Sequence, residues 1–483
     1  MATLNKQSVR EEAERIKQEF SRLASTEKMD SEMKALFQSM LLLLNLLIAI
    51  FLEKNTKKTK ANSGKPPSQT EKDESSLSNQ GSKGKGKPEE NHMAKNTRTR
   101  ETTVLIPVNA CDQCGESLKN TTCKCTEKRT QIDIIFEKVI DHTVVEIKDC
   151  PNCHAEVKGQ FPDHMKGPLQ YGGGIKAFAV CLMITQMVAL KRAQNMIKTL
   201  IGKVISEATL LSYVMKLHHA LEQWELSAKE SLLKRPSIHT DETSLRVDKK
   251  NYWIHVYSSG DITLKFLHRK RGTDAMNDIN IIPRYGGTIV HDCWASYLSY
   301  QHCSHGLCGS HLLRELTFII EANHYRWAKN MKKLLQEACS NVTKSKRKKL
   351  TKKKYAKLQR RYRNILTRAE RELPIIPEKP SGRRGKMAKS DAHNLVERLT
   401  KHEEAVLLFA RDAHVAFTNN RAERDLRMAK VKQKVSGCFR VEKYAHAYCR
   451  ISSYLQTMAN KGINPLIAIQ MAFAGEISDK GGE

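Results

Sequence analysis

The feature that most constrains the fold is a series of strand-like segments directly after Pro236. They read SIHTDETSLRV (residues 237–247), NYWIHVYSS (251–259) and ITLKFLHRK (262–270), and all three are rich in apolar, β-branched or aromatic residues. Their spacing is typical of hairpins. A helical segment then precedes a further apolar strand that ends in TIVHDC (288–293). This order of elements predicts an α/β or α+β domain built on a mixed sheet.

Two acidic residues interrupt the first of these strands. Asp241 shares one face of the strand with His239, and Glu242 takes the opposite face, with a supporting or surface role. Because an unpaired buried carboxylate costs several kcal/mol or more, we expect a metal, a cation or an accessible cleft beside one of them. Asp292 lies at the carboxyl end of the later strand, where ligands gather in α/β sheets. If the two strands are neighbours, Asp241 and Asp292 meet across the sheet, and Mg²⁺ or Mn²⁺ would offset their repulsion.

A third acid, Glu423, lies in NNRAERDLR (residues 419–427), which has the pattern of an amphipathic helix. It is a candidate third ligand for such a metal site. Asn420 and Glu423 also have the spacing of a capping box, and Glu423 can pair with Arg427 one turn later. The spacing alone leaves both interpretations open.

The charge of the chain favours a polyanionic partner. The formal net charge is +30, from 82 Lys and Arg against 52 Asp and Glu, and phosphates neutralised by such residues release counterions. A soluble protein with basic tails is the alternative. The strongest bias lies in a largely helical insertion, about residues 329–395, where Tyr355 and Tyr362 lie among lysines and arginines. We expect this insertion to bind DNA phosphates rather than to be only a solvated charged helix.

Two C-x-x-C pairs predict a zinc ribbon. Cys111 with Cys114 and Cys150 with Cys153 flank a strand-like interior, and two such knuckles complete a tetrahedral S₄ site for one structural Zn²⁺. No secretory signal is recognisable, so we expect a reducing cytoplasm and metal binding rather than disulfides. Further candidate ligands are Cys123, Cys125 and His154.

The N-terminal segment is helical in pattern, with apolar residues repeating at steps of three and four. Its most apolar part, residues 36–52, is barely long enough to span a membrane and contains Asn45. We therefore expect an oligomerising coiled coil, with a membrane or interfacial helix as the alternative. Further along, two helical stretches flank Gly202, which is compatible with a helix-turn-helix and equally with a plain helical hairpin.

Four short motifs together resemble a known family. HTDET (239–243), HDCWASY (291–297), HGLCGSHLLREL (305–316) and NNRAERDLR (419–427) look like the catalytic core of insertion sequence 66 family transposases, a DDE group with a ribonuclease-H-like fold. The resemblance covers most of the chain from about residue 110 onward, including the order of its parts.

The resemblance implies an Asp-Asp-Glu triad that holds two Mg²⁺ (or Mn²⁺) ions: Asp241, Asp292 and Glu423. The family's usual Cys-Trp-Ala-His motif stands here as Cys308-Gly309-Ser310-His311, which leaves the role of His311 open. His239 and His311 are candidates for orienting the metal ligands. Candidate DNA-phosphate ligands on the helix that carries the third acid are Arg421, Arg424 and Arg427, whose alternative is pairing with nearby acids.

The implied function is that of an insertion-sequence DNA transposase, which binds terminal inverted repeats and catalyses metal-dependent strand cleavage and strand transfer. Two DNA ends must be held together, so we expect a homo-oligomer, with accessory proteins of the element as further partners and no membrane. We expect a bacterial cytoplasmic, nucleoid-associated protein. The alternatives are a catalytically inactive zinc-containing DNA-binding regulator and a related metal-dependent nuclease.

The sequence predicts a multidomain chain with six parts. These are a coiled-coil helix (1–53), a disordered basic linker (54–100), a zinc-ribbon-like module (101–158), a helical region that could contain a helix-turn-helix (159–235), a ribonuclease-H-like catalytic core with the basic insertion (236–435) and a C-terminal helical region (436–483).

Overall fold

A computed structural model describes most of the chain. Its described residues are 6–24, 30–59, 62, 102–132, 137–377 and 387–477. The chain divides into two compact units. The first comprises Met1–Ser82, Leu221–Lys461 and Ser478–Glu483, and the second comprises Lys83–Ala220 and Gly462–Ile477.

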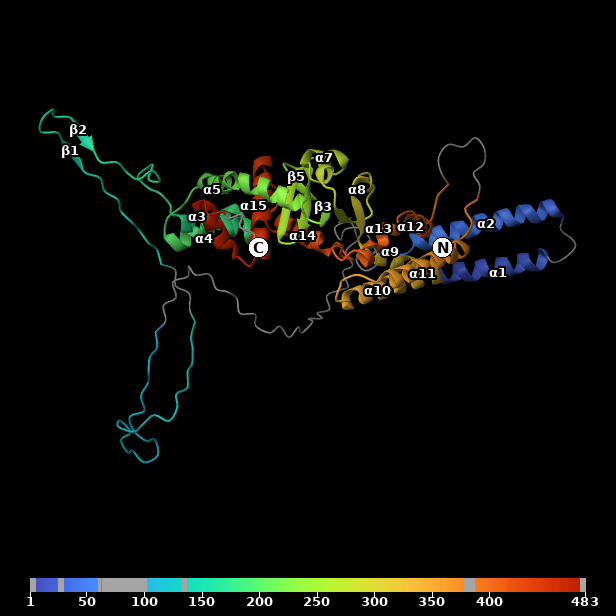
Figure 1. Ribbon diagram of the computed structural model, residues 1–483, viewed down its shortest axis with the longest axis horizontal. Coiled ribbons are helices and arrows are strands. Elements are labelled where there is room, and N and C mark those ends of the chain that lie inside the picture. Colours follow the sequence, from blue (N-terminus) through green and yellow to red (C-terminus); the bar gives the residue numbers. More distant parts are fainter. Residues whose placement is uncertain are drawn as a thin grey trace. The chain divides into compact units, whose positions relative to one another are not determined.

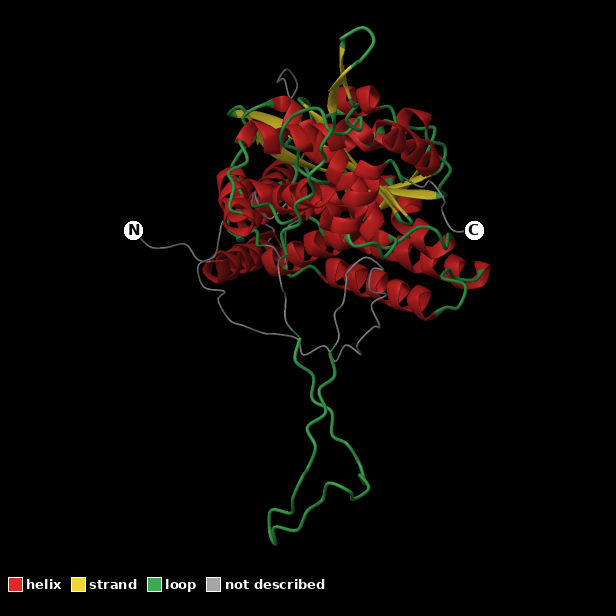
Figure 2. Ribbon diagram, turned by 90° about the vertical axis from the view of Figure 1, so that its left-hand side faces the viewer, coloured by secondary structure: helices red, strands yellow, loops and turns green. Residues whose placement is uncertain are grey.

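The first unit contains a five-stranded mixed sheet (Figures 1 and 2). Its strands lie in the order β5-β4-β3-β6-β7. The first three pair antiparallel, and β3, β6 and β7 pair parallel. The predicted mixed sheet is confirmed, and the strands that carry the first two acids are neighbours. The strand bounds are β3 Ser237–Val247, β4 Lys250–Ser259, β5 Ile262–His268, β6 Thr288–His291 and β7 Ser304–Leu307.

The hairpins follow from local backbone chemistry. The turn between β3 and β4 consists of Asp248 and Lys249, both with positive φ (46° and 60°), as in a two-residue hairpin whose twist matches the strands. In β3 the even-numbered side chains from Ile238 to Glu242 are buried, and the odd-numbered ones from His239 to Thr243 are half-buried. The strand therefore turns one face to the packed interior and presents Asp241 on the other.

Helices cover the sheet and its edge. Helix α15 (Glu442–Asn460) packs on β5, and α14 (Asn420–Ser436) packs on β3. The hydroxyl oxygens of Ser453 and Thr457 on α15 accept hydrogen bonds from backbone N–H groups of β5, at 2.8 and 3.1 Å. This edge strand is thereby closed to further pairing. Shorter elements around the sheet are α6 (Glu222–Leu233), α7 (Thr273–Ile279), a 3₁₀ turn (Ile282–Arg284) and α8 (Ala295–Leu298).

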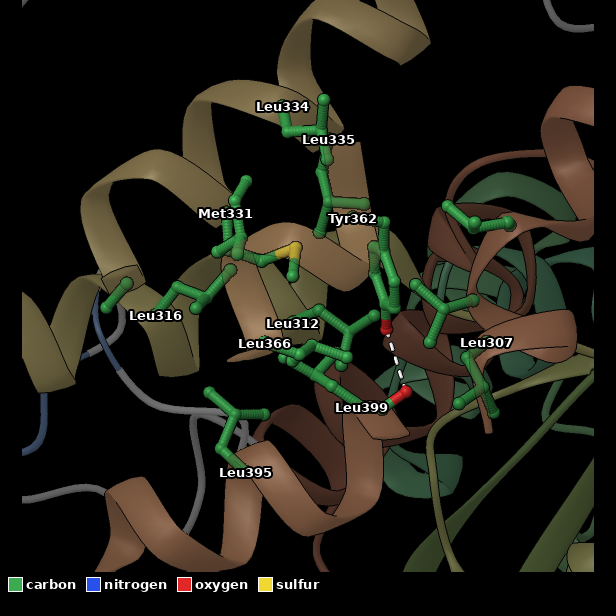
Figure 3. Close-up of a cluster of buried hydrophobic side chains, with 14 of the residues drawn as sticks. Leu307, Leu312, Leu316, Met331, Leu334, Leu335, Tyr362, Leu366, Leu395 and Leu399 are labelled. Atoms are coloured by element: carbon green, nitrogen blue, oxygen red, sulfur yellow. Dashed lines mark hydrogen bonds between the residues drawn. The ribbon is translucent and has the colours of Figure 1, made fainter. Parts of the chain in front are cut away.

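The basic insertion is part of a helical bundle with a single apolar core, shown in Figure 3. The bundle comprises α9 (Gly309–Asn323), α10 (Arg326–Lys344), α11 (Lys352–Glu372), α12 (Asp391–Lys401) and α13 (Glu403–Arg411). Tyr362 is fully buried and its hydroxyl donates to the carbonyl of Leu399 at 2.8 Å, and Tyr355 packs against the same core. Both tyrosines therefore stabilise the bundle, and the binding of DNA phosphates by this insertion stays a prediction.

The N-terminal segment forms two helices, α1 (Lys6–Ala24) and α2 (Ser31–Lys54), that lie side by side in Figure 1. Phe20 and Phe37 stack between them with ring centroids 5.9 Å apart. Helix α2 also leaves large apolar side chains exposed, among them Leu36 and Met40. By length and composition it is the one described helix that could cross a membrane, although apolar helices of soluble proteins pass the same test.

The end of α2 docks on the helical bundle. Glu53 is buried and accepts hydrogen bonds from the backbone N–H groups of Asp391 and Ala392 at the start of α12, the second at 3.0 Å. Lys58 pairs with Asp391 at 2.6 Å. The first residues of the predicted linker are therefore packed against the core, whereas most of that linker lies outside the described residues.

The second unit contains a short hairpin and four helical elements. Helix α4 ends at Gly202, whose φ is +74°, and at the start of α5 the hydroxyl of Ser206 accepts from the N–H of Thr209 at 3.0 Å. The predicted helix, break and helix are confirmed. Helix α16 packs on α3 and α5. The bounds are β1 Ile147–Asp149, β2 Glu156–Lys158, α3 Gly173–Val180 with a π-helical continuation Cys181–Thr185, α4 Leu190–Ile201, α5 Glu207–Ala220 and α16 Pro465–Ala474.

Candidate active site

The three predicted acids come from three segments of the first unit. Asp241 lies in the middle of β3, Asp292 directly follows β6, and Glu423 lies in the first turn of α14. In the parallel pair of β3 and β6, His239 lies opposite Val290. Asp241 and Asp292 each follow by two residues, so both lie at the same level of the sheet, and α14 packs on β3 beside them.

The acids are close enough to interact electrostatically. Burial raises the pKa of Asp241 well above its usual value, and the negative charges of Glu242, Asp292 and Glu423 raise it further. Burial also raises the pKa of Asp292, against the N–H of Trp294, which donates to its Oδ1 at 3.3 Å. Several buried carboxylates that repel one another are the donor set that a divalent cation relieves. The residue types present thus suit Mg²⁺ or Mn²⁺, but across the described residues the carboxylate oxygens of Asp241, Asp292 and Glu423 do not all lie within 4.8 Å of one another.

Glu423 has an oxygen without a hydrogen-bond partner. Its Oε1 is buried and unpaired, as is Nδ1 of His311, and these two atoms are 3.7 Å apart. Its Oε2 lies 3.8 Å from the guanidinium of Arg314. The capping-box interpretation is wrong, because the N-cap residue of α14 is Asn419 and makes no side-chain capping bond. In the ion pairs that the structure describes, Glu423 faces Arg314 and not Arg427.

Asn419 connects the start of α14 with β3 and with the start of α9. Its Nδ2 donates to the carbonyl of Thr240 at 2.8 Å, and its Oδ1 lies 3.0 Å from Nδ1 of His239. Its backbone N–H donates to Sγ of Cys308 at 3.1 Å. His239, a predicted neighbour of the metal ligands, therefore contacts Asn419. Sequence reasoning missed Asn419 because it assigned the helix start to the adjacent Asn420.

Glu242 is not a surface residue. Its carboxylate is buried, pairs with Arg271 at 2.6 Å and accepts a hydrogen bond from the hydroxyl of Tyr297. The guanidinium of Arg271 lies over the rings of Trp294 (4.3 Å) and Trp253 (5.0 Å). Of the two roles predicted for Glu242, support of the site is the one that this geometry fits. The role of Arg271 was missed because nothing local in the sequence links it to Glu242.

The first residue of α9, Gly309, has no room for a side chain. A Cβ on Gly309 would lie 2.3 Å from the ring of Phe417, and the N–H of Gly309 donates to the carbonyl of Phe417 at 2.7 Å. The tryptophan that the resembled family has at this position would not fit here. Burial, with the positive charges of Arg314 and Arg398, lowers the pKa of His311 to about 4, so its imidazole is neutral at pH 7.

The three arginines of α14 are not equivalent. Arg424 and Arg427 are exposed. Arg421 is half-buried and its guanidinium donates to the carbonyl of Ile262 at 3.4 Å. Arg421 therefore contacts the sheet, and the other two are free to meet a ligand from solvent.

A cavity of about 360 Å³ is lined by one of the three acids, Asp292. Trp294 and His311 also line it, and Lys58 and Arg398 contribute positive charge. Nε of Arg398 is buried without a hydrogen-bond partner. Sequence reasoning missed both basic residues, since Lys58 lies in the presumed linker and Arg398 lies just after the predicted insertion.

The cysteine knuckles are formed locally. In the first, the N–H of Gly115 donates to the carbonyl of Cys111 at 3.0 Å; in the second, the N–H of His154 donates to the carbonyl of Cys150 at 2.8 Å. In each knuckle hydrogen bonds from the following residues lower the pKa of the first cysteine, which favours the thiolate that binds metal. Across the described residues, no three of the ribbon cysteines have their sulfurs within 4.8 Å of one another. The joint zinc site therefore stays a prediction.

The fold and the site define a mixed α/β protein with three electrostatically coupled, partly buried acids beside two parallel strands. The family model of the IS66 transposases matches residues 168–447. This is more than half of the chain, and the chain belongs to this family. Membership implies a transposase with a DNA substrate and a use of divalent metal ions. No curated protein matches the chain.

Proposed function

We propose that the protein is an active insertion-sequence transposase that binds terminal inverted repeats and cleaves and joins DNA strands through Asp241, Asp292 and Glu423. One observation carries the proposal. Asp292 and Glu423, which lie 51 and 182 positions after Asp241 in the chain, both raise the pKa of Asp241, and Glu423 has a buried oxygen without a hydrogen-bond partner.

The topology supports a ribonuclease-H-like core. Three antiparallel strands are followed in the sheet by two that run parallel to the central strand β3, and the first two acids lie on β3 and after β6. The six-part division, the zinc ribbon and the oligomerising N-terminal helices belong to the same proposal. So does action on DNA in the bacterial cytoplasm.

The side chains of the chain would hold the reacting groups in place. Asp241, Asp292 and Glu423 would bind two Mg²⁺ or Mn²⁺ ions, which activate an attacking oxygen and stabilise a leaving oxygen when bound. Arg271 forms an ion pair with Glu242 and lies close enough to Asp292 to lower its pKa. This ion pair would keep the structure next to Asp292 rigid. This rigidity matters because misplacement by about 1 Å costs on the order of 100-fold in rate.

DNA phosphates would contact the exposed basic side chains. Arg424 and Arg427 lie on the helix that bears the third acid. Helix α11 buries its apolar residues and exposes a further basic face, which includes Lys353, Lys357 and Arg360. Such contacts supply affinity without sequence information.

The test is incubation of the purified full chain with DNA that carries the terminal inverted repeats, target DNA and Mg²⁺. Nicked ends together with strands joined to the target support a transposase. Nicked ends alone identify a nuclease, and binding without either product identifies a regulator. Asp241→Asn, which preserves size and removes the charge, is expected to bind the DNA and form no product.

A further inference from the structure

Three side chains that offer different donor atoms converge at the start of α9. They are Cys308 at its N-cap, His311 in its first turn and Glu423 on α14. Sγ of Cys308, a ring nitrogen of His311 and a carboxylate oxygen of Glu423 all lie within 4.8 Å of one another. Among the described residues, this is the one group of three potential metal ligands whose members all belong to the same unit.

We propose that Cys308, His311 and Glu423 form a binding site for one thiophilic divalent ion such as Zn²⁺. Two of the three donor atoms, Nδ1 of His311 and Oε1 of Glu423, are buried without a hydrogen-bond partner. A buried polar atom without a partner is destabilising, and a shared metal ion would satisfy both atoms at once.

The spacing of the donors suits such an ion. Typical Zn–S, Zn–N and Zn–O bond lengths in a tetrahedral site require ligand atoms about 3.4 to 3.6 Å apart. Nδ1 of His311 and Oε1 of Glu423 are 3.7 Å apart, so they need to shift by only a few tenths of an ångström. Three protein ligands leave a fourth position open, and a thiolate ligand selects against Mg²⁺.

The neighbouring backbone holds the donors in place. The N–H of Asn419 donates to Sγ of Cys308 at 3.1 Å, and the N–H of Gly309 donates to the carbonyl of Phe417 at 2.7 Å. These two bonds tie the segment before α14 to the start of α9. On the other side of Glu423, Arg314 lies 3.8 Å from Oε2, so it offsets charge on the oxygen that faces away from the ion.

This site and the proposed function both use Glu423, so the two sites would share its carboxylate; the binding test separates them because only this site includes a thiolate ligand beside Glu423. This site is tested by adding Co²⁺ to the metal-free full chain and recording the near-ultraviolet thiolate-to-cobalt band together with the number of ions bound. The ribbon cysteines contribute equally in all variants and cancel in difference spectra. Cys308→Ser is compared with Cys303→Ser, a matched control because Cys303 is also buried and belongs to no candidate metal cluster.

We expect wild type and Cys303→Ser to bind one more Co²⁺ per chain than Cys308→Ser, with a band stronger by one thiolate. His311→Gln, which retains the thiol, is expected to lose the same ion; this variant decides the matter if Cys308→Ser does not fold. Equal binding and equal spectra in folded wild type and His311→Gln would overturn the site. The binding test contains no DNA, and cleavage is measured separately. Cleavage by a protein that lacks the band would refute only the metal site. The band in a protein that does not cleave DNA would refute only the proposed function.

Discussion

Removal of the Asn419 side chain tests how the site is held together. Asn419 is 1 % exposed and links Thr240, next to Asp241, to the segment that starts α14. In Asn419→Ala the carbonyl of Thr240 and Nδ1 of His239 both lose their partner. Each unsatisfied buried group costs about 1–3 kcal/mol. For two groups, we therefore expect the free energy of unfolding to fall by about 2–6 kcal/mol.

The same change should also lower activity. The lost bonds fix the start of α14 against β3, and a shift of Glu423 by about 1 Å would slow cleavage on the order of 100-fold. The assays are urea unfolding followed by tryptophan fluorescence and Mg²⁺-dependent DNA cleavage by the folded variant. Asn420→Ala is the control, since this exposed neighbour makes only a 3.3 Å contact with Ser310. The reasoning fails if both variants unfold and cleave alike.

Three further predictions address the parts around the site. Glu53→Ala removes the carboxylate that caps α12. It should lower the free energy of unfolding by about 2 kcal/mol and make the end of α2 sensitive to protease, whereas substitution of the exposed neighbour, Lys54→Ala, should do neither. Burial lowers the pKa of His255 to about 4, below the unfolded value near 6.5, so stability falls as pH drops through this window. The free energy of unfolding, measured with urea, should fall by about 2.5 kcal/mol between pH 7 and pH 4.5 because of this residue. In His255→Gln this contribution to the pH dependence should be absent. Arg271→Ala leaves the buried Glu242 unpaired and should cost about 2–3 kcal/mol, measured by thermal unfolding; an unchanged melting temperature would show that the pair is not stabilising.

The strands and their acids could be predicted because the signal is local. β-branched and aromatic runs separated by short turns define β3 to β5, and the position of Asp292 after an apolar run places it at a strand end. The helical insertion was likewise visible in the sequence. The local pattern could not assign the role of each side chain. Tyr362 lies among basic residues in the sequence, yet its side chain is buried in the apolar core.

The residues that sequence reasoning missed act over long separations. Asn419 bonds to Thr240, 179 positions away, and Glu53 caps a helix that starts 338 positions later. Neither residue type stands out, because asparagine and glutamate are common at loops and exposed helix ends. Their roles depend on which segments the fold brings together.

Single substitution of the three acids tests the central claim most directly. Asp241→Ala, Asp292→Ala and Glu423→Ala are compared with Asp274→Ala, an exposed acid on α7, for Mg²⁺-dependent cleavage of terminal-repeat DNA by folded protein. The account predicts that each of the three abolishes cleavage while Asp274→Ala cleaves like wild type. Cleavage at the wild-type rate by any one of the three would contradict the proposed site.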